Sequence, residues 1–186
     1  KSYGSTPYVF TAVQTVNGTA AIETRVSQTS ATDFTAGLCE HQTGNNDNCD
    51  GGHITETIGW VAIEPGNIPW NETAELGIET NVGNSSWVNV SFSESYSQTP
   101  VMLAENVTEN GGQESQIDEA RNITTADGEI RYCEIESADG SCNGHTGENI
   151  NWTAATAGSL SIGDPDANSE EMTSSSYTVV RDSLNS

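Results

Sequence analysis

The chain has 186 residues, of which 27 are Asp or Glu and only five are Lys or Arg, so its formal net charge at pH 7 is −22. Nucleic acids and anionic membrane surfaces bind clustered Lys and Arg, and this composition excludes both as expected partners. The acidity is typical of a surface that resists non-specific association, binds cations or works in high salt. No stretch approaches the roughly 20 apolar residues of a membrane span. The first residue is Lys1 rather than Met, from which we expect a mature or excised form.

The N-terminal third of the chain predicts four strands. Short runs rich in Val, Ile and Thr alternate with Gly, Asn and Asp turns, and no helical period persists. The predicted strands are Tyr8–Thr15, Ala20–Gln28, Asp33–Glu40 and Glu56–Ile63.

The middle of the chain predicts a linker followed by a second set of strands. Residues 67–85 resemble connecting material, whereas residues 86–96 alternate apolar and polar side chains as an opening strand does. Four further strands are predicted at Val101–Thr108, Ser115–Asn122, Glu129–Glu136 and Asn149–Thr156.

The two sets of strands are copies of one sequence. Thr6-Pro7 returns as Thr99-Pro100, and the stretch from His53 through Glu56 and Trp60 to Gly66 returns, at identical spacing, from His145 to Gly158. A self-match of this length predicts a duplicated domain rather than a solenoid repeat. We therefore expect an all-β chain of two tandem antiparallel β-sandwich domains, at residues 1–66 and 86–158, with a loop and tail strand at 159–186.

The first copy has no counterpart of the opening strand, whereas the tail has a strand to spare. Ser176 lies 18 residues past Gly158, much as Ser86 lies 20 past Gly66. A sandwich without its first strand exposes an unpaired sheet edge that another strand can fill. The predicted donor residues are Tyr177, Val179, Val180 and Leu184, and the predicted acceptor is the groove beside Tyr8–Thr15. Docking within one molecule and excision from a longer tandem array are the alternatives.

Four cysteines occupy matched positions in the two copies. Cys39 with Cys49, and Cys133 with Cys142, enclose short loops that disulfides would close in an oxidising compartment. A metal site is the alternative, although no C-x-x-C spacing occurs.

Seven N-x-Ser/Thr sequons also predict an extracellular, glycosylated surface. They begin at Asn17, Asn71, Asn84, Asn89, Asn106, Asn122 and Asn151.

Few residues offer chemistry. On strands, a His and a Glu three residues apart point to opposite faces, so His53 with Glu56 and His145 with Glu148 favour structural hydrogen bonds over metal binding or catalysis. The acidic loops around Asp47 and Asp139 could hold calcium, but Asx-rich turns explain them better. We expect no enzyme activity and no cofactor, with Ca²⁺ as the one candidate ion.

Arg25 and Arg121 stand at similar places in the two copies, in a chain with few cations. Each is expected to pair with a carboxylate that holds the sheet, with an outward role toward a ligand as the alternative.

The duplicated pattern resembles the H-type lectin domain and related repeats of bacterial surface proteins. The match includes Phe92-x-x-x-Tyr96-x-x-x-Pro100 and Ile150-Asn-Trp152-x-Ala154 in the second copy, and Gly59-Trp60-Val-Ala62 in the first. The resemblance implies a six-stranded antiparallel sandwich, extracellular placement and, in some members, binding of N-acetylgalactosamine-like sugars.

These features together predict a secreted, glycosylated structural or adhesive protein. Its copies would join head to tail by strand complementation into a filament or surface assembly, so its main partner is itself. The alternative is a soluble or surface-displayed lectin that binds carbohydrate without polymerising.

Overall fold

The computed structural model describes residues 3–18, 22–27, 29–40, 54–65, 74–83, 86–110, 116–134, 146–156, 159–160 and 177–178. Every regular element in these ranges is a β-strand, and all pairings are antiparallel, which confirms the all-β prediction. None of the described segments forms a helix long and apolar enough to cross a membrane.

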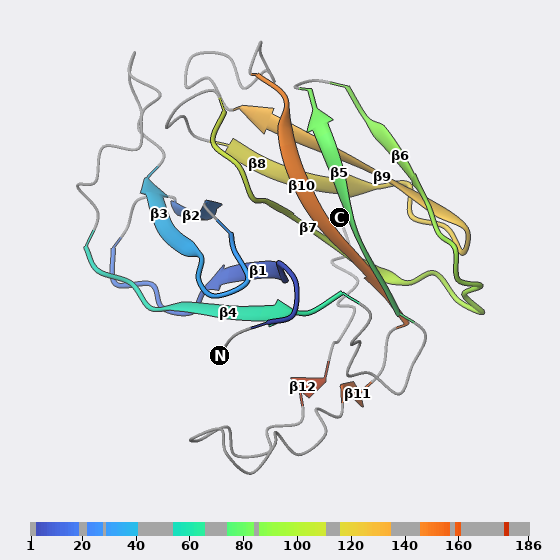
Figure 1. Cartoon of the computed structure of the whole chain (residues 1–186), viewed down its shortest axis with the longest axis horizontal. Coiled ribbons are helices and arrows are strands. Elements are labelled where there is room, and N and C mark those ends of the chain that lie inside the picture. Colours follow the sequence, from blue (N-terminus) through green and yellow to red (C-terminus); the bar gives the residue numbers. More distant parts are fainter. Residues whose placement is uncertain are drawn as a thin grey trace.

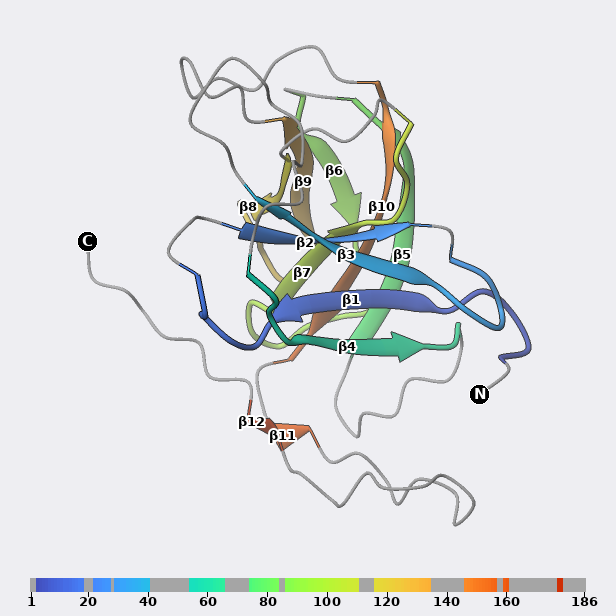
Figure 2. The same cartoon turned by 90° about the vertical axis from the view of Figure 1, so that its left-hand side faces the viewer.

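Four strands form the N-terminal repeat, and they pair in two ladders (Figures 1 and 2). β1 (Tyr8–Val13) pairs with β4 (Ile58–Ile63), and β2 (Ile22–Ser27) pairs with β3 (Thr35–Glu40). Each lies within one or two residues of its predicted bounds.

Six strands form the C-terminal repeat, in two sheets of three. One sheet has the order β5–β10–β7 and the other β6–β9–β8. The bounds are β5 (Ala74–Val82), β6 (Val88–Ser91), β7 (Val101–Asn106), β8 (Gln116–Arg121), β9 (Asp127–Glu134) and β10 (Glu148–Ala155).

Apolar side chains from both sheets meet in one core. Trp152 and Ile150 of β10 pack with Val82 of β5, and Ile130 and Tyr132 of β9 close the cluster from the other sheet. Such burial on alternate residues of facing strands is what fixes the register of a two-layer arrangement.

The duplication extends to the pairing register. Thr11 faces Trp60 across β1 and β4, and Ala104 faces Trp152 across β7 and β10. Cys39 faces Glu23 as Cys133 faces Ile117. Two ladders with the same register at matched sequence positions are strong support for a common ancestral unit.

The hairpins that precede β3 and β9 are also the same turn. Ser30 and Thr124 each accept hydrogen bonds from two backbone N–H groups through their hydroxyl oxygens. Each hydroxyl also donates to the aspartate three residues on, Asp33 or Asp127, at 3.0 and 2.6 Å. Side chains that bond locally in this way favour tight turns over continued strands.

One prediction about organisation is wrong. The segment 67–85, predicted to be a linker, contains β5, which pairs along its length with β10. Gly77 lies opposite Trp152, and a Cβ on this glycine would stand 2.4 Å from the indole ring. The large ring therefore lies over the neighbouring strand, where only glycine leaves room for it.

Two short strands of the tail region pair with each other. β11 (Ser159–Leu160) and β12 (Tyr177–Thr178) form a ladder of two residues each. The predicted donor residues Val179, Val180 and Leu184 lie outside the described residues.

Candidate assembly site

The residues singled out for possible chemistry are part of the framework. Glu56 accepts hydrogen bonds from Thr15 Oγ1 (2.6 Å), Asn17 N (2.6 Å) and Gly18 N (3.0 Å). A buried carboxylate that accepts several donors fixes a turn, and it is acceptor-only when ionised.

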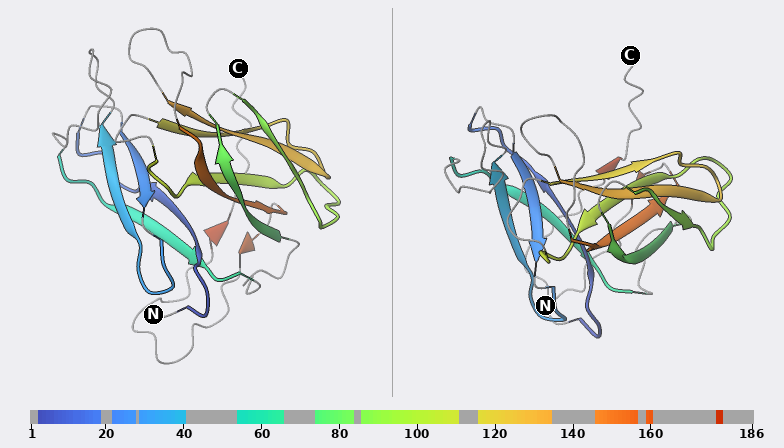
Figure 3. Two further views of the ribbon diagram at one scale, coloured as in Figure 1. Left: turned by 45° about the horizontal axis from the view of Figure 1, so that its top comes forward. Right: turned by 90° about the horizontal axis from the view of Figure 1, so that it is seen from above.

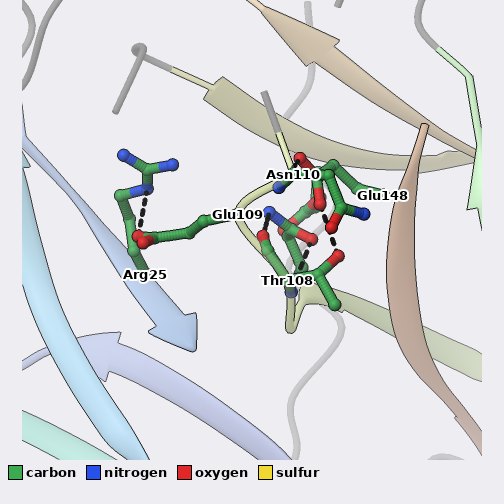
Figure 4. Close-up of polar contacts among 7 residues, drawn as sticks. Arg25, Thr108, Glu109, Asn110 and Glu148 are labelled. Atoms are coloured by element: carbon green, nitrogen blue, oxygen red, sulfur yellow. Dashed lines mark hydrogen bonds and ion pairs between the residues drawn. The ribbon is translucent and has the colours of Figure 1, made fainter. Parts of the chain in front are cut away.

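The C-terminal repeat contains the same network around Glu148, which is fully buried (Figure 4). Glu148 accepts from Thr108 Oγ1 and from Asn110 N (2.7 Å), and Asn110 Nδ2 donates to Gly147 O at 2.9 Å. These contacts agree with the structural role expected for both glutamates. His53 and His145 lie outside the described residues.

Arg25 joins the two repeats. It is 6% exposed, and its Nε lies 3.7 Å from Glu109 Oε1 of the C-terminal repeat (Figure 4). The expected carboxylate pair is therefore present, but it bridges repeats rather than strands of one sheet.

Arg121 is not the counterpart of Arg25, contrary to the expectation from sequence. Arg25 faces Gly37, two residues before Cys39, and the residue at that place in the C-terminal repeat is Glu119. Arg121 instead bonds Glu129 at 2.8 Å and lies 3.8 Å from the centre of the Trp87 ring. β2 and β8 correspond through the residues that face Cys39 and Cys133. In that alignment Arg25 matches Glu119, two residues before Arg121.

The junction between the repeats contains buried acids as well as apolar contacts. Val107, which follows β7, packs against Val9 and Val26 of the N-terminal repeat. Glu105 is 7% exposed and accepts from Thr11 Oγ1 at 2.6 Å. The two repeats are therefore packed against each other through buried side chains, in addition to being linked along the chain.

Burial shifts the pKa values of two carboxyls at this junction. Desolvation raises the pKa of Glu105 to about 8. The hydrogen bonds from Thr11 lower this pKa, whereas the neighbouring charge of Asp118 raises it further. Desolvation likewise raises the pKa of Asp118 to about 7, although its Oδ2 accepts from Asn106 N at 2.6 Å.

Cys39 and Cys133 are both disulfide-bonded. Cys49 and Cys142, the predicted partners, lie outside the described residues, so the pairing itself stays a prediction.

The sequons divide by burial. Asn106 and Asn151 are each 3% exposed within the sheet, so the prediction of a glycan is wrong for these two positions in this fold. Asn17, Asn89 and Asn122 are exposed, whereas Asn71 and Asn84 lie outside the described residues.

No described group of three or more His, Cys, Asp or Glu side chains could hold a metal ion. The loops around Asp47 and Asp139, where calcium was considered, lie outside the described ranges.

The feature that distinguishes the repeats is an open side on the first. Among the described strands, β5 and β6 of the C-terminal repeat have no counterparts in the N-terminal repeat, so the outer edges of β4 and β3 have no described strand beside them. Trp152 is 6% exposed beneath β5, whereas Trp60, at the matched position, is 60% exposed, and Val61 is 45% exposed. A large aromatic side chain left this open, next to edges that no described strand pairs, marks a surface for another chain segment.

The opening strand of the C-terminal repeat is β6, and its partner is β9. β9 in turn corresponds to β3. A tail strand that repeats β6 therefore has β3 as its acceptor by analogy, rather than the predicted groove beside Tyr8–Thr15.

Comparison of the chain with protein-family models, curated proteins and solved structures finds no match. The resemblance to H-type lectin domains therefore stays a prediction.

Proposed function

We propose that this protein is a non-enzymatic structural subunit made of two tandem sandwich domains of the H-type lectin-like kind. Copies join head to tail when the tail of one molecule completes the open side of the N-terminal repeat of the next. The product is an extracellular filament or surface assembly, with disulfides and N-linked glycans on its subunits.

The observation that carries this proposal is the contrast between the two tryptophans. Trp152 and Trp60 share one register against the neighbouring strand, yet one is covered by β5 and the other is 60% exposed. Trp60 marks the open side of the first repeat, where a docked strand can pair with the edge of β3 that no described strand pairs. Any apolar surface that this strand buries adds about 25 cal/mol per Å² to the association.

The geometry of joining determines the product. The acceptor edge belongs to the N-terminal repeat and the donor to the tail, so the contact is heterologous. Such contacts form closed rings or open fibres, rather than symmetric dimers.

Deletion of residues 176–186 tests the proposal. The truncated protein is expected to remain folded and monomeric, because these residues lie beyond the last strand of the C-terminal repeat. The full chain is expected to form larger species in sedimentation and negative-stain micrographs. Assembly of the truncated chain to the same extent would refute the proposal.

The exposed Trp60 also favours the alternative of a lectin, because an open aromatic face beside Phe34 (ring centroids 5.3 Å apart) suits stacking against an apolar sugar face. This alternative predicts glycan-array binding that survives the tail deletion and is lost in Trp60→Ala. Strand complementation predicts the opposite dependence on the tail.

A further inference from the structure

We propose that the tail of a second copy docks on the outer edge of β3 in one defined register, with Tyr177 beside Gly37 and Arg181 beside Asp33. This inference rests on the proposed function and specifies its partner and its contacts. β3 lies at one side of the molecule, and β2 pairs with the edge of β3 opposite to this one (Figure 3).

The register comes from the C-terminal repeat, which contains the complete arrangement. There Val88 faces Ile130, Val90 faces Gly128 and Ser91 faces Asp127. Asp33 and Cys39 match Asp127 and Cys133, which places β3 on β9. Ser175-Ser176-Tyr177 matches Ser85-Ser86-Trp87, which places the tail on β6.

The C-terminal repeat, with β6 paired to β9, is the template for the tail docked on β3. At one aromatic position, β3 and the tail each differ from this template, and the two differences complement each other. In the C-terminal repeat, a Cβ on Gly128 would lie 2.8 Å from Met102 Sδ and 3.6 Å from Phe92 Cζ. The Phe92 ring lies against Trp152, with centroids 6.1 Å apart. In the N-terminal repeat the matching residue is Phe34, whose ring lies against Trp60.

In the N-terminal repeat, Phe34 of the acceptor thus already supplies the ring that Phe92, which follows β6, supplies in the C-terminal repeat. A second ring from the donor would overpack this space. The tail has Asp182 where the C-terminal repeat has Phe92, so it brings no second ring into this space.

A second complementary position is Gly37. In the template Trp87 stands beside Arg131, which lies 4.5 Å from its ring centre. Gly37 replaces this arginine, and a Cβ built on it would meet no atom within 4 Å. Tyr177 would cover this open glycine, and an aromatic side chain opposite a glycine is a known stabilising device in sheets.

The third position is electrostatic. The register places Arg181, one of five basic residues in the chain, opposite Asp33, which is exposed. Opposite charges facing each other across strands stabilise the pairing, whereas like charges destabilise it.

Two described contacts bear on access to the edge. Tyr3 N donates to Ala31 O at 2.8 Å, just beyond Asp33, so it borders the proposed register without overlapping it. The ladder between β11 and β12 holds Tyr177 and Thr178 through two residue pairs. Docking on β3 would replace this short ladder by one of five residue pairs.

Charge reversal in the full chain tests the register. Asp33→Arg and Arg181→Asp should each raise the concentration needed for half-assembly about fivefold, since a cross-strand charge pair is worth up to about 1 kcal/mol. An equimolar mixture of the two single variants should recover assembly, because each tail then meets an edge of opposite charge. Asp127→Arg is the matched control: it changes the net charge equally and removes the same turn contact, in a repeat that already has β6.

The outcomes separate the register from the function. Loss of assembly on tail deletion, together with a mixture that does not recover, overturns the register and leaves the proposed function standing. A full chain that stays monomeric at every concentration means that the tail docks on its own molecule, which overturns docking of a second copy. Assembly without the tail removes both.

Discussion

Glu105 is buried between the two repeats, and its ionisation should make the stability of their junction depend on pH. Its pKa is about 8 in the folded chain, against an ordinary value of 4.5, because burial disfavours the charged form. Between these values the folded chain binds more protons than the unfolded chain, so the free energy of unfolding falls as pH rises. Asp118, with a pKa of about 7, acts in the same direction. We expect a higher Tm at pH 5.5 than at pH 8.5.

The variant Glu105→Gln should flatten this dependence, because glutamine still accepts the Thr11 hydroxyl and cannot ionise. Glu129→Gln serves as the control. This partly exposed carboxyl has a lowered pKa through its contacts with Arg121 and Asn122, so its removal should leave the slope between pH 6 and 8 unchanged. Thermal unfolding followed by circular dichroism at five pH values decides the matter. A Tm of the native sequence that rises over this range would contradict the assignment.

At the scale of single elements, the fit of β5 to Trp152 predicts an asymmetric response to alanine. Gly77→Ala places a methyl group 2.4 Å from the indole of a buried tryptophan, so either the ring or the strand must shift. We expect a loss of about 1–3 kcal/mol in the free energy of unfolding, as for other overpacked sites. The matched variant Gly37→Ala meets open space and should cost little or slightly stabilise the chain. Urea titrations of both variants measure the difference, and equal losses would count against this packing.

The elements that could be predicted from sequence are those with a strong local pattern. The runs that became β1 and β7 each follow a proline and precede an Asn-Gly turn, and their bounds were nearly correct. β5 was missed because its sequence mixes Leu76 and Ile78 with glycine, glutamate and asparagine. Its strand character comes from pairing with β10 and from the indole that lies over Gly77, and both depend on residues 66 or more positions away.

The open side of the first repeat shows the same division. The duplication revealed from sequence that an opening strand was missing, and hence that an edge could be free. Sequence could not identify that edge as β3, because the choice depends on β6 pairing with β9 rather than β7. The junction residues Glu105 and Val107 carried no signal either, since the matched residues Ala12 and Gln14 in the first repeat differ from them. An alignment of the copies shows where they differ, but not which differences face each other.

For the whole molecule, the net charge of −22 should dominate the kinetics of joining. Two such subunits repel at long range, and the single pair of Arg181 with Asp33 acts only at contact. The Debye length falls from about 30 Å at 0.01 M salt to about 8 Å at 0.15 M, so added salt screens the repulsion far more than it weakens a pair partly shielded within a docked strand. We expect head-to-tail assembly, followed by light scattering, to speed up as NaCl is raised from about 10 to about 150 mM. The Arg181→Asp variant should keep this salt dependence while assembling more slowly at every concentration. Slower assembly of the native sequence in salt would mean that attraction between charged surfaces drives the encounter, and that the acidic surface contains a basic complement beyond Arg181.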